Sequence, residues 1–592
     1  MKKWLSPLLR YLLISIPIVA ILAFSTRSFT TFSILKNTLV WCLLLLSIIV
    51  WHPQKSASPI FVGFSLLFLG WNAFSLLWTP NIGQGLLYLS TYSLGIIWIF
   101  IIQDVEKTYR SHKQKISPKK NLADIQLLAI FWLIAANIAS LLAIYQRFWS
   151  LRLGLHQITS TIGNPNRLAG LLLIFMPLGW WLFVASSQKK ARIFGASSIF
   201  VLFSGIMASR CHSALIASFV LFILWLIYYA QKNQHLKKHI LPLIIAIIST
   251  FTTLILSSST ILRVLWKSLE GRFFIHHLSW QLWKEDLWLG VGLGGYPSKI
   301  SWIQAKALQV SSHSWTNLRD PHNQFFQIAT ETGLIGIILF ILIMAWFIKD
   351  IWKNKDRPHG FATLSALSVF FLYSMSETSM LSISSMLILS FWLVFGRLDE
   401  PSDVQFFLSP QKTNSRWYIL FLLVGMWGFL QSTQNLYSDW MLGQGIKLSE
   451  KNFSLQKELN SYNNAVFYAS EPSKALFYRG LFWQKLQKWL LAQKDFRRSF
   501  EQLPTPDRAL AIGNSLFRQH KLKQAIYWGQ KAIFLHPQYA RAYANTGFFY
   551  IQLKRYHFAW RYLRRARSLR PFDKRIIKLW KQLPLKWQKI TK

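Results

Sequence analysis

The sequence predicts an all-α protein in two parts, a polytopic helical membrane domain followed by a soluble array of paired helices. Of its 592 residues, 52% are hydrophobic and 15% are charged, an apolar fraction that is difficult to reconcile with a soluble chain of this length. Apolar runs of about 20 residues, each able to cross about 30 Å of hydrocarbon, recur as far as residue 432. From residue 473 onward, prolines and small residues recur instead at a regular spacing of about 34 residues. We therefore expect a membrane domain at 1–432, a linker at 433–472 and a repeat domain at 473–592.

The apolar runs predict about thirteen membrane spans. The first run follows Lys2 and Lys3 in the manner of a signal peptide, but it has no clear small-residue cleavage site, so we interpret it as a span. The predicted spans are 8–24, 32–51, 59–78, 85–103, 125–147, 165–186, 193–209, 211–230, 240–257, 324–348, 361–376, 379–396 and 417–432.

The basic residues predict the orientation of these spans. Clusters of Lys and Arg occupy 104–124, 189–192, 232–238 and 349–357, whereas the alternate connections at 79–84 and 377–378 contain none. Because cytoplasmic loops carry the excess of Lys and Arg, the clustered side is cytoplasmic and the amino terminus lies inside. We therefore expect a multi-pass membrane protein with the loops 148–164 and 258–323 and the carboxyl-terminal repeats on the outer side of the membrane.

The net charge and the number of cysteines limit the kinds of partner and metal site that the chain can have. The chain has 66 Lys and Arg residues against 22 Asp and Glu residues, a net charge of +44. Much of this charge lies in short loops and in the tail, so orientation signalling and attraction to membrane lipids explain it more simply than nucleic-acid binding. The two cysteines, Cys42 and Cys211, predict neither a disulfide framework nor a thiolate metal site. No cofactor or metal is expected, because no HExxH spacing or acidic cluster accompanies His276, His277, His313 and His322.

The stretch from Gly290 to Gly336 holds the most informative motifs. It opens with GVGLGGY, crosses a segment rich in Ser, His and Trp, and continues from Asp320 as DPHNQFFQIATETGLIGI. The polar corner at 320–323 thus precedes an apolar run that enters the membrane, and His322 is titratable near neutrality at this boundary. The glycines do not follow a strand of a strand–helix unit, so they predict a tight re-entrant turn and not a nucleotide-binding loop.

The tail resembles an array of tetratricopeptide repeats. Its periodic positions are Pro504, Pro537 and Pro571, with Gly480, Gly513 and Gly547 at one constant distance before them and Ala492, Ala525 and Ala559 at another. The resemblance implies three repeats of paired helices over 473–571, a capping helix over 573–592 and a protein partner for the repeats. The alternative is an irregular helical tail.

The central stretch resembles the O-antigen ligase family, which also includes O-antigen polymerase-like members and protein O-oligosaccharyltransferases. The resemblance covers about 200–345, and its motifs are Ser209-Arg210, Gly271-Arg272, GVGLGGY and the His-Asn corner followed by Glu331, Gly333 and Gly336. Upstream, Tyr145-Gln146 and Gly163-Asn164-Pro165-Asn166 also fit the family pattern. The chain departs from this pattern at Cys211-His212, where small or aliphatic residues are more frequent, and at Asp286-Leu287-Trp288, where a proline commonly precedes the glycine turn.

The resemblance implies a metal-independent transfer of a glycan from undecaprenyl diphosphate to an acceptor hydroxyl, of lipid A-core or of a protein. It also implies that the protein lies in a bacterial inner membrane, so that the outer side, with the repeats, is the periplasmic face where transfer occurs. His322 would be the general base that takes the hydroxyl proton, because its ordinary pKa suits this step near pH 7. Arg210 and Arg272 would hold the diphosphate, since a guanidinium matches phosphate oxygens and stays charged. The other implied substrate-binding residues are Asn323, Arg319, Glu331, Asn166, Gln146 and Gly292.

Simpler structural interpretations exist for several of these residues. Arg210 also fits a snorkelling arginine at a span end, and Arg272 a solvated loop residue. His322 also fits a helix start beside Asp320 and Pro321. An acidic residue inside a span is costly unless it is paired, so we expect an arginine to be the partner of Glu331.

Two other classes of function stay open at this point. A non-catalytic assembly protein would use its repeats to organise an envelope complex, and it would tolerate replacement of Arg210, Arg272 and His322. A transporter is disfavoured, because the sequence shows no internal inverted repeat and few charged residues at mid-span.

Overall fold

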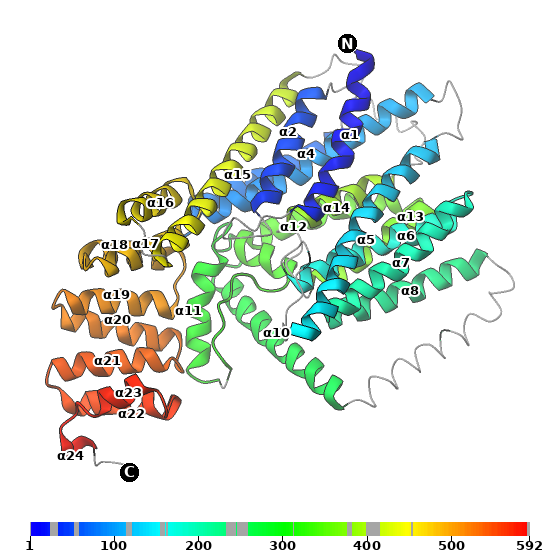
Figure 1. The fold of residues 1–592 in the computed structure, drawn as a ribbon. Coiled ribbons are helices and arrows are strands. Elements are labelled where there is room, and N and C mark those ends of the chain that lie inside the picture. The colour runs from blue at the N-terminus through cyan, green and yellow to red at the C-terminus, as the bar shows by residue number, and fades with distance from the viewer. Residues whose placement is uncertain are drawn as a thin grey trace.

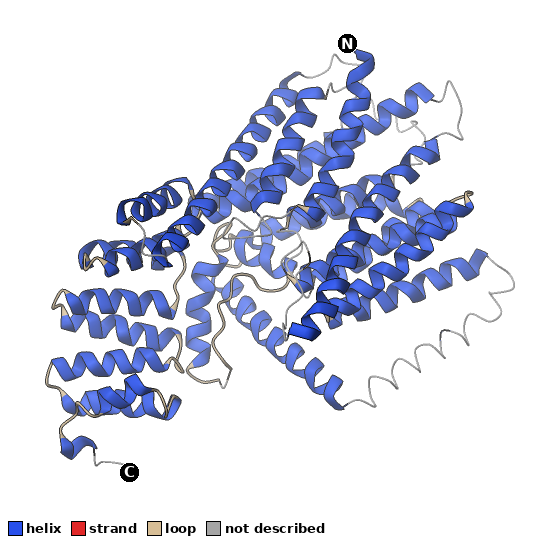
Figure 2. Cartoon of the chain, viewed as in Figure 1, coloured by secondary structure: helices blue, strands red, loops and turns tan. Residues whose placement is uncertain are grey.

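The computed structural model describes residues 2–23, 34–51, 59–113, 121–153, 160, 164–232, 244, 259–311, 313–375, 382–397, 415–450 and 454–588. Within these ranges the chain is built of helices and turns and contains no strand (Figure 2). The predicted all-α class is therefore confirmed.

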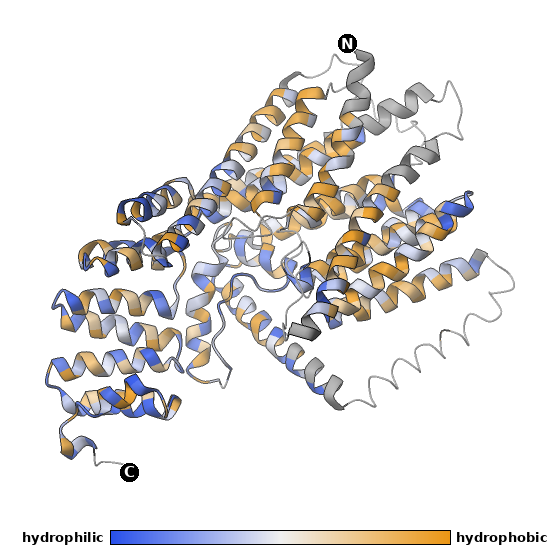
Figure 3. Ribbon diagram, in the orientation of Figure 1, coloured by the Kyte–Doolittle hydropathy of each residue, from blue (hydrophilic) through white to orange (hydrophobic). Residues whose placement is uncertain are grey.

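The membrane part is a bundle of apolar helices that carries the repeat domain at one end (Figure 1). Its helices are α1 (Lys2–Leu22), α2 (Ile34–Val50), α3 (Pro59–Phe74), the 3-10 turn η1 (Ser75–Leu77), α4 (Ile82–Lys113), α5 (Asn121–Leu153), α6 (Pro165–Ala185), α7 (Lys189–Ser209), α8 (His212–Lys232), α10 (Ser259–Glu285), α11 (Tyr296–Leu308), α12 (Gln324–Trp352), α13 (Pro358–Ser374), α14 (Ile383–Phe395) and α15 (Ser415–Glu450). Figure 3 shows apolar residues along most of the bundle and a higher share of polar residues in the repeats.

Among the described residues, seven helices are long and apolar enough to cross a membrane, judged by length and composition. They are Ile60–Leu77, Ile82–Asp104, Ile130–Trp149, Pro165–Ala185, Lys189–Ser209, His212–Gln231 and Gln324–Trp352. Twelve of the predicted spans overlap described helices, and the span predicted at 240–257 lies outside the described residues apart from Ile244. The multi-pass class is thus supported, and the count of about thirteen spans stays a prediction.

The connections predicted to be cytoplasmic meet at one end of the bundle. Asp350, near the end of α12, lies 2.6 Å from an Nη2 atom of Arg397, which follows α14. The Tyr228 hydroxyl of α8 donates a hydrogen bond of 3.1 Å to the backbone carbonyl of Asp356. Trp51, after α2, donates from Nε1 to a carboxylate oxygen of Asp104 on α4 at 2.8 Å.

The connections predicted to be periplasmic meet at the other end. Trp78, after η1, donates from Nε1 to the carbonyl of Gly290 at 3.1 Å. The Arg147 Nε atom of α5 donates to the carbonyl of Ala208 at the end of α7, at 3.2 Å. The Asn323 amide donates to the carbonyl of Met375, which follows α13, at 3.2 Å. Loops far apart in the sequence therefore build one polar end of the bundle.

The repeat domain begins where the bundle ends. Its helices are α16 (Leu455–Tyr468), α17 (Ser473–Lys485), α18 (Trp489–Gln502), α19 (Pro506–Arg518), α20 (Leu522–Leu535), α21 (Ala540–Gln552), α22 (Tyr556–Leu569), α23 (Lys574–Trp580) and α24 (Leu585–Gln588). Three antiparallel pairs, α17–α18, α19–α20 and α21–α22, form the predicted repeats. The periodic alanines Ala492, Ala525 and Ala559 are fully buried between helices, which explains their spacing.

Two details of the tail differ from the prediction. The segment expected to be a linker is helical, because α15 continues unbroken to Glu450 and α16 packs back against it. The expected single capping helix is divided into α23 and the short α24, with Pro584 between them. Proline cannot donate to the preceding helical turn, so it separates the two.

Helix α11 lies between the bundle and the repeat stack (Figure 1). Its Ala305 is fully buried in the hydrophobic core of the repeat domain. Trp302 packs on Phe500 of α18, with ring centroids 6.0 Å apart, and the Lys531 ammonium of α20 lies 5.0 Å from the Trp302 ring centroid. Beyond α11, Gln309 donates to the carbonyl of Phe534 at 2.9 Å. The loop that joins the glycine turn to the polar corner is therefore held by the repeats.

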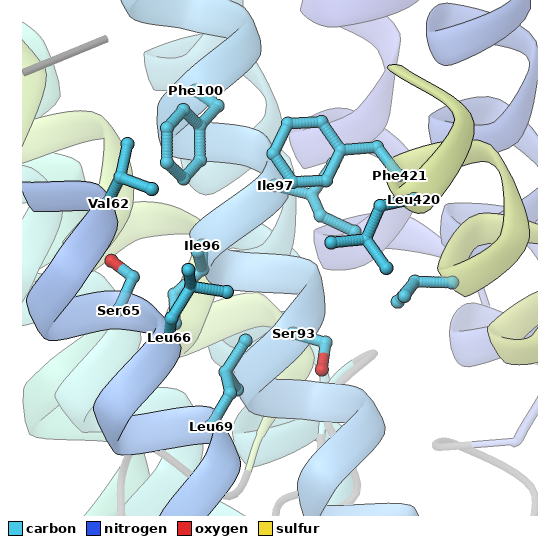
Figure 4. Close-up of a pocket in the computed structure, with 11 residues that line it drawn as sticks. Val62, Ser65, Leu66, Leu69, Ser93, Ile96, Ile97, Phe100, Leu420 and Phe421 are labelled. Atoms are coloured by element: carbon cyan, nitrogen blue, oxygen red, sulfur yellow. The ribbon is translucent and has the colours of Figure 1, made fainter. Parts of the chain in front are cut away.

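An apolar pocket lies at the side of the bundle, away from this polar end. It has a volume of about 60 Å³ and opens between α3, α4 and α15 (Figure 4). Its lining along α4 runs from Ser93 to Phe100, which places it about 16 Å or more from the Ile82 end of that helix at 1.5 Å per residue. The remaining lining residues are Val62, Ser65, Leu66, Leu69, Leu420, Phe421 and Val424.

Candidate functional site

The glycine turn at 290–295 is wedged between two helical elements. Gly290, Gly292 and Gly294 have φ angles of +68°, +87° and +77°, a region that favours glycine. A Cβ on Gly292 would lie 2.6 Å from the Thr79 Cα atom, so a side chain has no room there. The turn is fixed to α12 by hydrogen bonds from the Val291 and Gly292 amides to the carbonyls of Thr330 and Glu331, at 2.8 and 2.9 Å. The predicted tight turn is thus what the chain adopts, and its re-entrant position in the membrane stays a prediction.

Helix α12 bends to receive this turn. Gly333 interrupts the helix with φ +69° and ψ −168°, and a Cβ there would overlap the carbonyl oxygen of Trp288. The Leu334 amide, released from the helical pattern, donates instead to the carbonyl of Leu287 at 2.9 Å. The glycines at 290–295 and Gly333 are therefore one structural unit, which explains why the sequence has them in both places.

Glu331 supports the turn from inside α12. Its side chain is 1% exposed, and its carboxylate accepts the backbone N–H of Tyr296 at 3.3 Å and that of Gly294. The sequence predicts an arginine partner, whereas in the described structure the hydrogen-bond donors to Glu331 are these backbone amides. Amide donors can satisfy a buried carboxyl without a second charge, so Glu331 acts here as a clamp on the turn.

The polar corner places a carboxylate directly beside an imidazole. Asp320 Oδ1 accepts the backbone N–H of His322 at 3.0 Å and lies 3.4 Å from His322 Nδ1. His322 has a φ angle of +49°, which costs energy in a residue with a side chain and is more frequent at functional sites. The side chain of Asp320 is 15% exposed and that of His322 is 39% exposed, so the ring reaches solvent while its carboxylate partner is sheltered.

The residue that caps α12 is Asn323 and not His322. The Asn323 Oδ1 atom accepts the N–H groups of Phe325 and Phe326, at 2.9 and 3.1 Å, and its amide donates to Met375. Asn323, and not His322, is therefore the residue that caps the start of this helix. Its role of orienting the His322 ring or holding an acceptor hydroxyl stays a prediction, since its amide already makes these structural hydrogen bonds.

Arg272 approaches the corner together with a second histidine. His276 lies one turn after Arg272 on α10, and its ring centroid is 5.5 Å from that of Phe326 on α12. Burial lowers the pKa of His276, a hydrogen bond with the backbone of His322 opposes this, and the positive charges of Arg272 and His322 lower it further. The Nε2 atom of His276 is buried without a hydrogen-bond partner among the described residues.

Arg167 joins the corner from the start of α6. Its Nη2 atom lies 3.9 Å from Asp320 Oδ2, so the Asp320 carboxylate lies between Arg167 and His322. The Arg167 Nε atom is buried and has no hydrogen-bond partner in the described part of the chain. A donor of this kind beside a polar corner is available to an oxygen of a ligand.

Arg210 lies at the same end of the bundle. It ends α7 in a left-handed conformation with φ +58°, and its charge lies close to that of Arg147 on α5. Helices α6 and α7 are antiparallel, because a Cβ on Gly205 would lie 2.9 Å from Leu172 and a Cβ on Gly179 would lie 3.1 Å from the Gly195 carbonyl. Continuing this register brings Arg210 to the start of α6, where Arg167 is located.

The sequence comparison agrees with this geometry. Residues 197–341, which include Arg210, Arg272, the glycine turn and His322, match the family model described as O-antigen ligase. Over this segment the chain is similar to the O-antigen ligase family. The predicted family resemblance is confirmed over these residues.

Other comparisons add little to the O-antigen ligase assignment. No curated protein matches the chain significantly. Among solved structures, a crystal structure of MamA protein is 19% identical, covers 25% of this chain and 79% of its own, and has a TM-score of 0.23. YrrB, titled a TPR protein with an unusual peptide-binding site, is 18% identical over 28% of this chain and 86% of its own, also with a TM-score of 0.23. The APC/C hetero-tetramer Cut9-Hcn1 is 12% identical, covers 92% of this chain and 80% of its own, and has a TM-score of 0.23.

Two predicted residues upstream of the O-antigen ligase segment hold backbone at the polar end. The Gln146 Oε1 atom accepts the N–H of Ser160 at 2.7 Å. The Asn166 carbonyl accepts a hydrogen bond from the Tyr373 hydroxyl of α13, and its N–H donates to Asn164 Oδ1 at 2.8 Å. Both residues lie at the expected end of the bundle, and their role toward a substrate stays a prediction.

Arg319, the third predicted arginine of the O-antigen ligase segment, faces the repeat domain. Its charge acts on Glu471, Lys474 and Arg508, which lie at the start of the repeats. Burial raises the pKa of Glu471, and the positive charges of Arg319, Arg508 and Lys474 oppose this effect. The corner is therefore joined electrostatically to the repeats through Arg319, and a role of this residue in substrate binding stays a prediction.

Sequence reasoning missed Asp320, His276 and Arg167 as members of the site. Asp320 is two residues before His322, the spacing at which an Asp side chain accepts a backbone N–H and can reach the next ring. His276 is four residues after Arg272, so both lie on one face of a helix. Arg167 follows the Asn164-Pro165 helix start, and only the fold brings it to Asp320.

Proposed function

We propose that this protein transfers a glycan from undecaprenyl diphosphate to an acceptor hydroxyl at the periplasmic face, in the manner of an O-antigen ligase. The observation that carries the proposal is the corner itself, a half-exposed imidazole beside a sheltered carboxylate within the matched segment, with Arg272 and Arg167 next to it. A base and several cations are the groups that such a transfer requires.

In the proposed reaction, His322 is the general base. Its Nδ1 atom lies toward Asp320, so a proton on Nδ1 leaves Nε2 as the basic atom. Nε2 takes the proton of the acceptor hydroxyl while the hydroxyl oxygen attacks the anomeric carbon. The bond between that carbon and the phosphate oxygen breaks, and undecaprenyl diphosphate leaves with the bonding electrons. Asp320 stabilises the imidazolium that results.

The arginines neutralise the leaving diphosphate. The positive charges of Arg210 and Arg147 act on each other, and two such cations at one end of the bundle favour an anion there. Arg272 approaches from α10 on the other side of the corner. The buried Nε atom of Arg167 and Nε2 atom of His276 are further groups that can hydrogen-bond to phosphate or sugar oxygens.

The lipid tail of the donor requires an apolar path within the bundle. The pocket between α3, α4 and α15 has the right chemistry, since its walls are apolar side chains apart from Ser65 and Ser93 (Figure 4). A polyprenyl chain is long enough to extend from the polar end into the hydrocarbon, and this pocket is our candidate for part of its path.

Three kinds of acceptor fit this chemistry. Lipid A-core is the acceptor of ligation, a protein is the acceptor of O-oligosaccharyl transfer, and a second lipid-linked glycan is the acceptor of polymerisation. The charge of Arg319, three residues before His322, acts on Glu471 at the start of the repeats, which favours an acceptor that the repeats can bring to the corner. A protein acceptor is therefore the second candidate.

Replacement of His322 tests the proposal. His322→Ala should abolish glycan transfer by the purified protein in lipid nanodiscs, at normal abundance and thermal stability. The matched control is His277→Ala, because His277 is exposed on α10 and bonds to Gln281 at 2.9 Å. Transfer at the normal rate by His322→Ala would exclude the base assignment and favour the non-catalytic assembly role.

A deletion strain identifies the acceptor. Loss of the whole polymer from lipid A-core on a lipopolysaccharide gel indicates ligation, and loss of chain length alone indicates polymerisation. Loss of a sugar from a protein on a glycoprotein gel indicates O-oligosaccharyl transfer. An unchanged pattern on both gels would contradict all three.

A further inference from the structure

Helix α10 carries an exposed apolar stripe that no part of the described structure covers. Trp266, Phe273 and Trp280 follow one another at seven-residue intervals and are 72%, 69% and 39% exposed. Residues seven apart on a helix differ by only about 20° in direction, so the three rings share one face. Leu269, 47% exposed, lies on the same face, about 40° from Phe273 at 100° per residue.

The other faces of α10 make different contacts. One face is buried through Leu278 and Leu282 against Tyr296 of α11 and forms a small core. A second face presents Arg272 and His276 to the corner. The polar side that faces solvent holds Lys267 and Glu285, both exposed and about 120° from Phe273 at 100° per residue. Glu270 and His277 border the apolar stripe, which lies between them and the face that carries Arg272. Figure 3 shows apolar and polar residues alternating along the helix.

The exposed apolar residues continue beyond the end of α10, toward the candidate span in α12. Leu287, Trp288 and Leu289 follow α10 and are all exposed, by 39%, 62% and 44%. The carbonyl of Leu287 accepts the N–H of Leu334, which begins the apolar run of the candidate span Gln324–Trp352. The end of the stripe is thus fixed beside the point at which α12 enters hydrocarbon.

From these observations we infer that α10 lies in the membrane interface, with the face formed by Trp266, Leu269, Phe273, Trp280 and Leu287–Leu289 immersed in the outer leaflet. The lipid of the outer leaflet covers this face. Tryptophan and phenylalanine are the residues that this region of a bilayer favours, and an amphipathic helix buries its apolar face by several ångströms there. The helix would then hold Arg272 and His276 at a fixed depth, at the level of a lipid-linked phosphate.

The charges on α10 fit a lipid surface. Arg263, Lys267 and Lys284 are exposed, and the Lys284 ammonium lies 5.2 Å from the Trp280 ring centroid. A lysine beside an interfacial tryptophan can keep its ammonium among head groups while its methylene chain lies along the apolar face. Basic residues at this level also attract anionic lipid.

Lipid accessibility of single positions on α10 tests this inference without any measurement of transfer. The full-length protein, with Cys42 and Cys211 replaced by serine, is labelled with a nitroxide at Phe273→Cys and placed in nanodiscs of phosphatidylethanolamine and phosphatidylglycerol. Collision with oxygen, which concentrates in lipid, is compared with collision with a water-soluble nickel complex. The matched control is Glu285→Cys, on the polar side of the same helix.

The expected result is that oxygen collides with the label at 273 several times more effectively than nickel does, and that the ratio is reversed at 285. A label at Trp266→Cys should behave like that at 273. The same water-like ratio at 273 and 285 would overturn the inference. Low accessibility to both reagents at 273 would also overturn it, since a protein partner or a second copy would then cover the stripe. Neither failure would affect the transferase proposal, which rests on the corner.

Discussion

Asp320 holds His322 twice, through a 3.0 Å hydrogen bond from the His322 backbone N–H and through a 3.4 Å approach of the same Oδ1 atom to the ring Nδ1. The backbone bond keeps His322 in its left-handed conformation, and the approach to the ring orients the imidazole. The two contacts can be separated by mutation, because an asparagine retains an oxygen acceptor and loses the charge.

Asp320→Asn should therefore preserve the corner and slow transfer. We expect a fall of about 10- to 100-fold in kcat, because the imidazolium formed in the reaction loses its carboxylate. The measurement is the rate of transfer in nanodiscs at saturating donor and acceptor. Asp286→Asn, at an exposed turn position, is the control. A kcat equal to that of the wild type would remove Asp320 from the mechanism.

Arg272 should contribute more than charge. Arg272→Ala is expected to lower kcat/KM by about 10- to 100-fold, the value of a lost charge-assisted hydrogen bond. Arg272→Lys should recover part of this loss, because lysine keeps the charge but cannot form the planar fork. Arg263→Ala, an exposed arginine of the same helix, should leave kcat/KM unchanged. Equal effects of the two alanine variants would indicate a general effect of helix charge.

The close packing at Gly333 predicts opposite effects for two glycine replacements. Gly333→Ala must place a Cβ against the Trp288 carbonyl at a φ of +69°, and should destabilise the fold by at least about 2 kcal/mol. Gly271→Ala meets no atom within 4 Å in the middle of α10, and should stabilise it by about 0.5–1 kcal/mol. Thermal unfolding in nanodiscs compares the two, and similar midpoints would contradict the described turn.

The contact of α11 with the repeats should determine how rigid the corner loop is. Trp302→Ala removes the packing on Phe500 and Lys531, and should cost the local contact about 1–3 kcal/mol. Amide hydrogen exchange of residues 296–308 should then become faster by about 10-fold for each 1.4 kcal/mol lost. Phe572→Ala, at a side chain that is 91% exposed, is the control. Unchanged exchange in α11 would show that the repeats do not support the loop.

His276 should make the fold less stable in acid. Burial holds the folded-state pKa of His276 below its ordinary value of 6.5. Between these two pKa values the unfolded chain binds a proton that the folded chain does not, so stability rises with pH in this window and is constant above 6.5. We expect a lower unfolding midpoint at pH 5.5 than at pH 7.5, with a smaller difference in His276→Asn. His277→Asn, at an exposed position, should retain the full difference.

The sequence by itself determined the helical class, the repeats and the polar corner. These features depend on patterns within one segment, such as an apolar run of span length or a proline that recurs at the length of one helical pair. The same holds for Gly292 and Gly333, whose positive φ angles leave glycine as the residue of choice. The continuation of α15 through the expected linker was less visible, because a mixed polar sequence becomes helical there by packing against α16.

Only the tertiary structure decided which side chains meet at the corner. Glu331 reaches the backbone of Tyr296 and not an arginine, Arg319 faces the repeats, and Arg167 comes to Asp320 from a distant part of the chain. Local periodicity says which face of a helix a residue occupies. It does not say which other helix lies against that face, because this depends on the packing of the whole bundle.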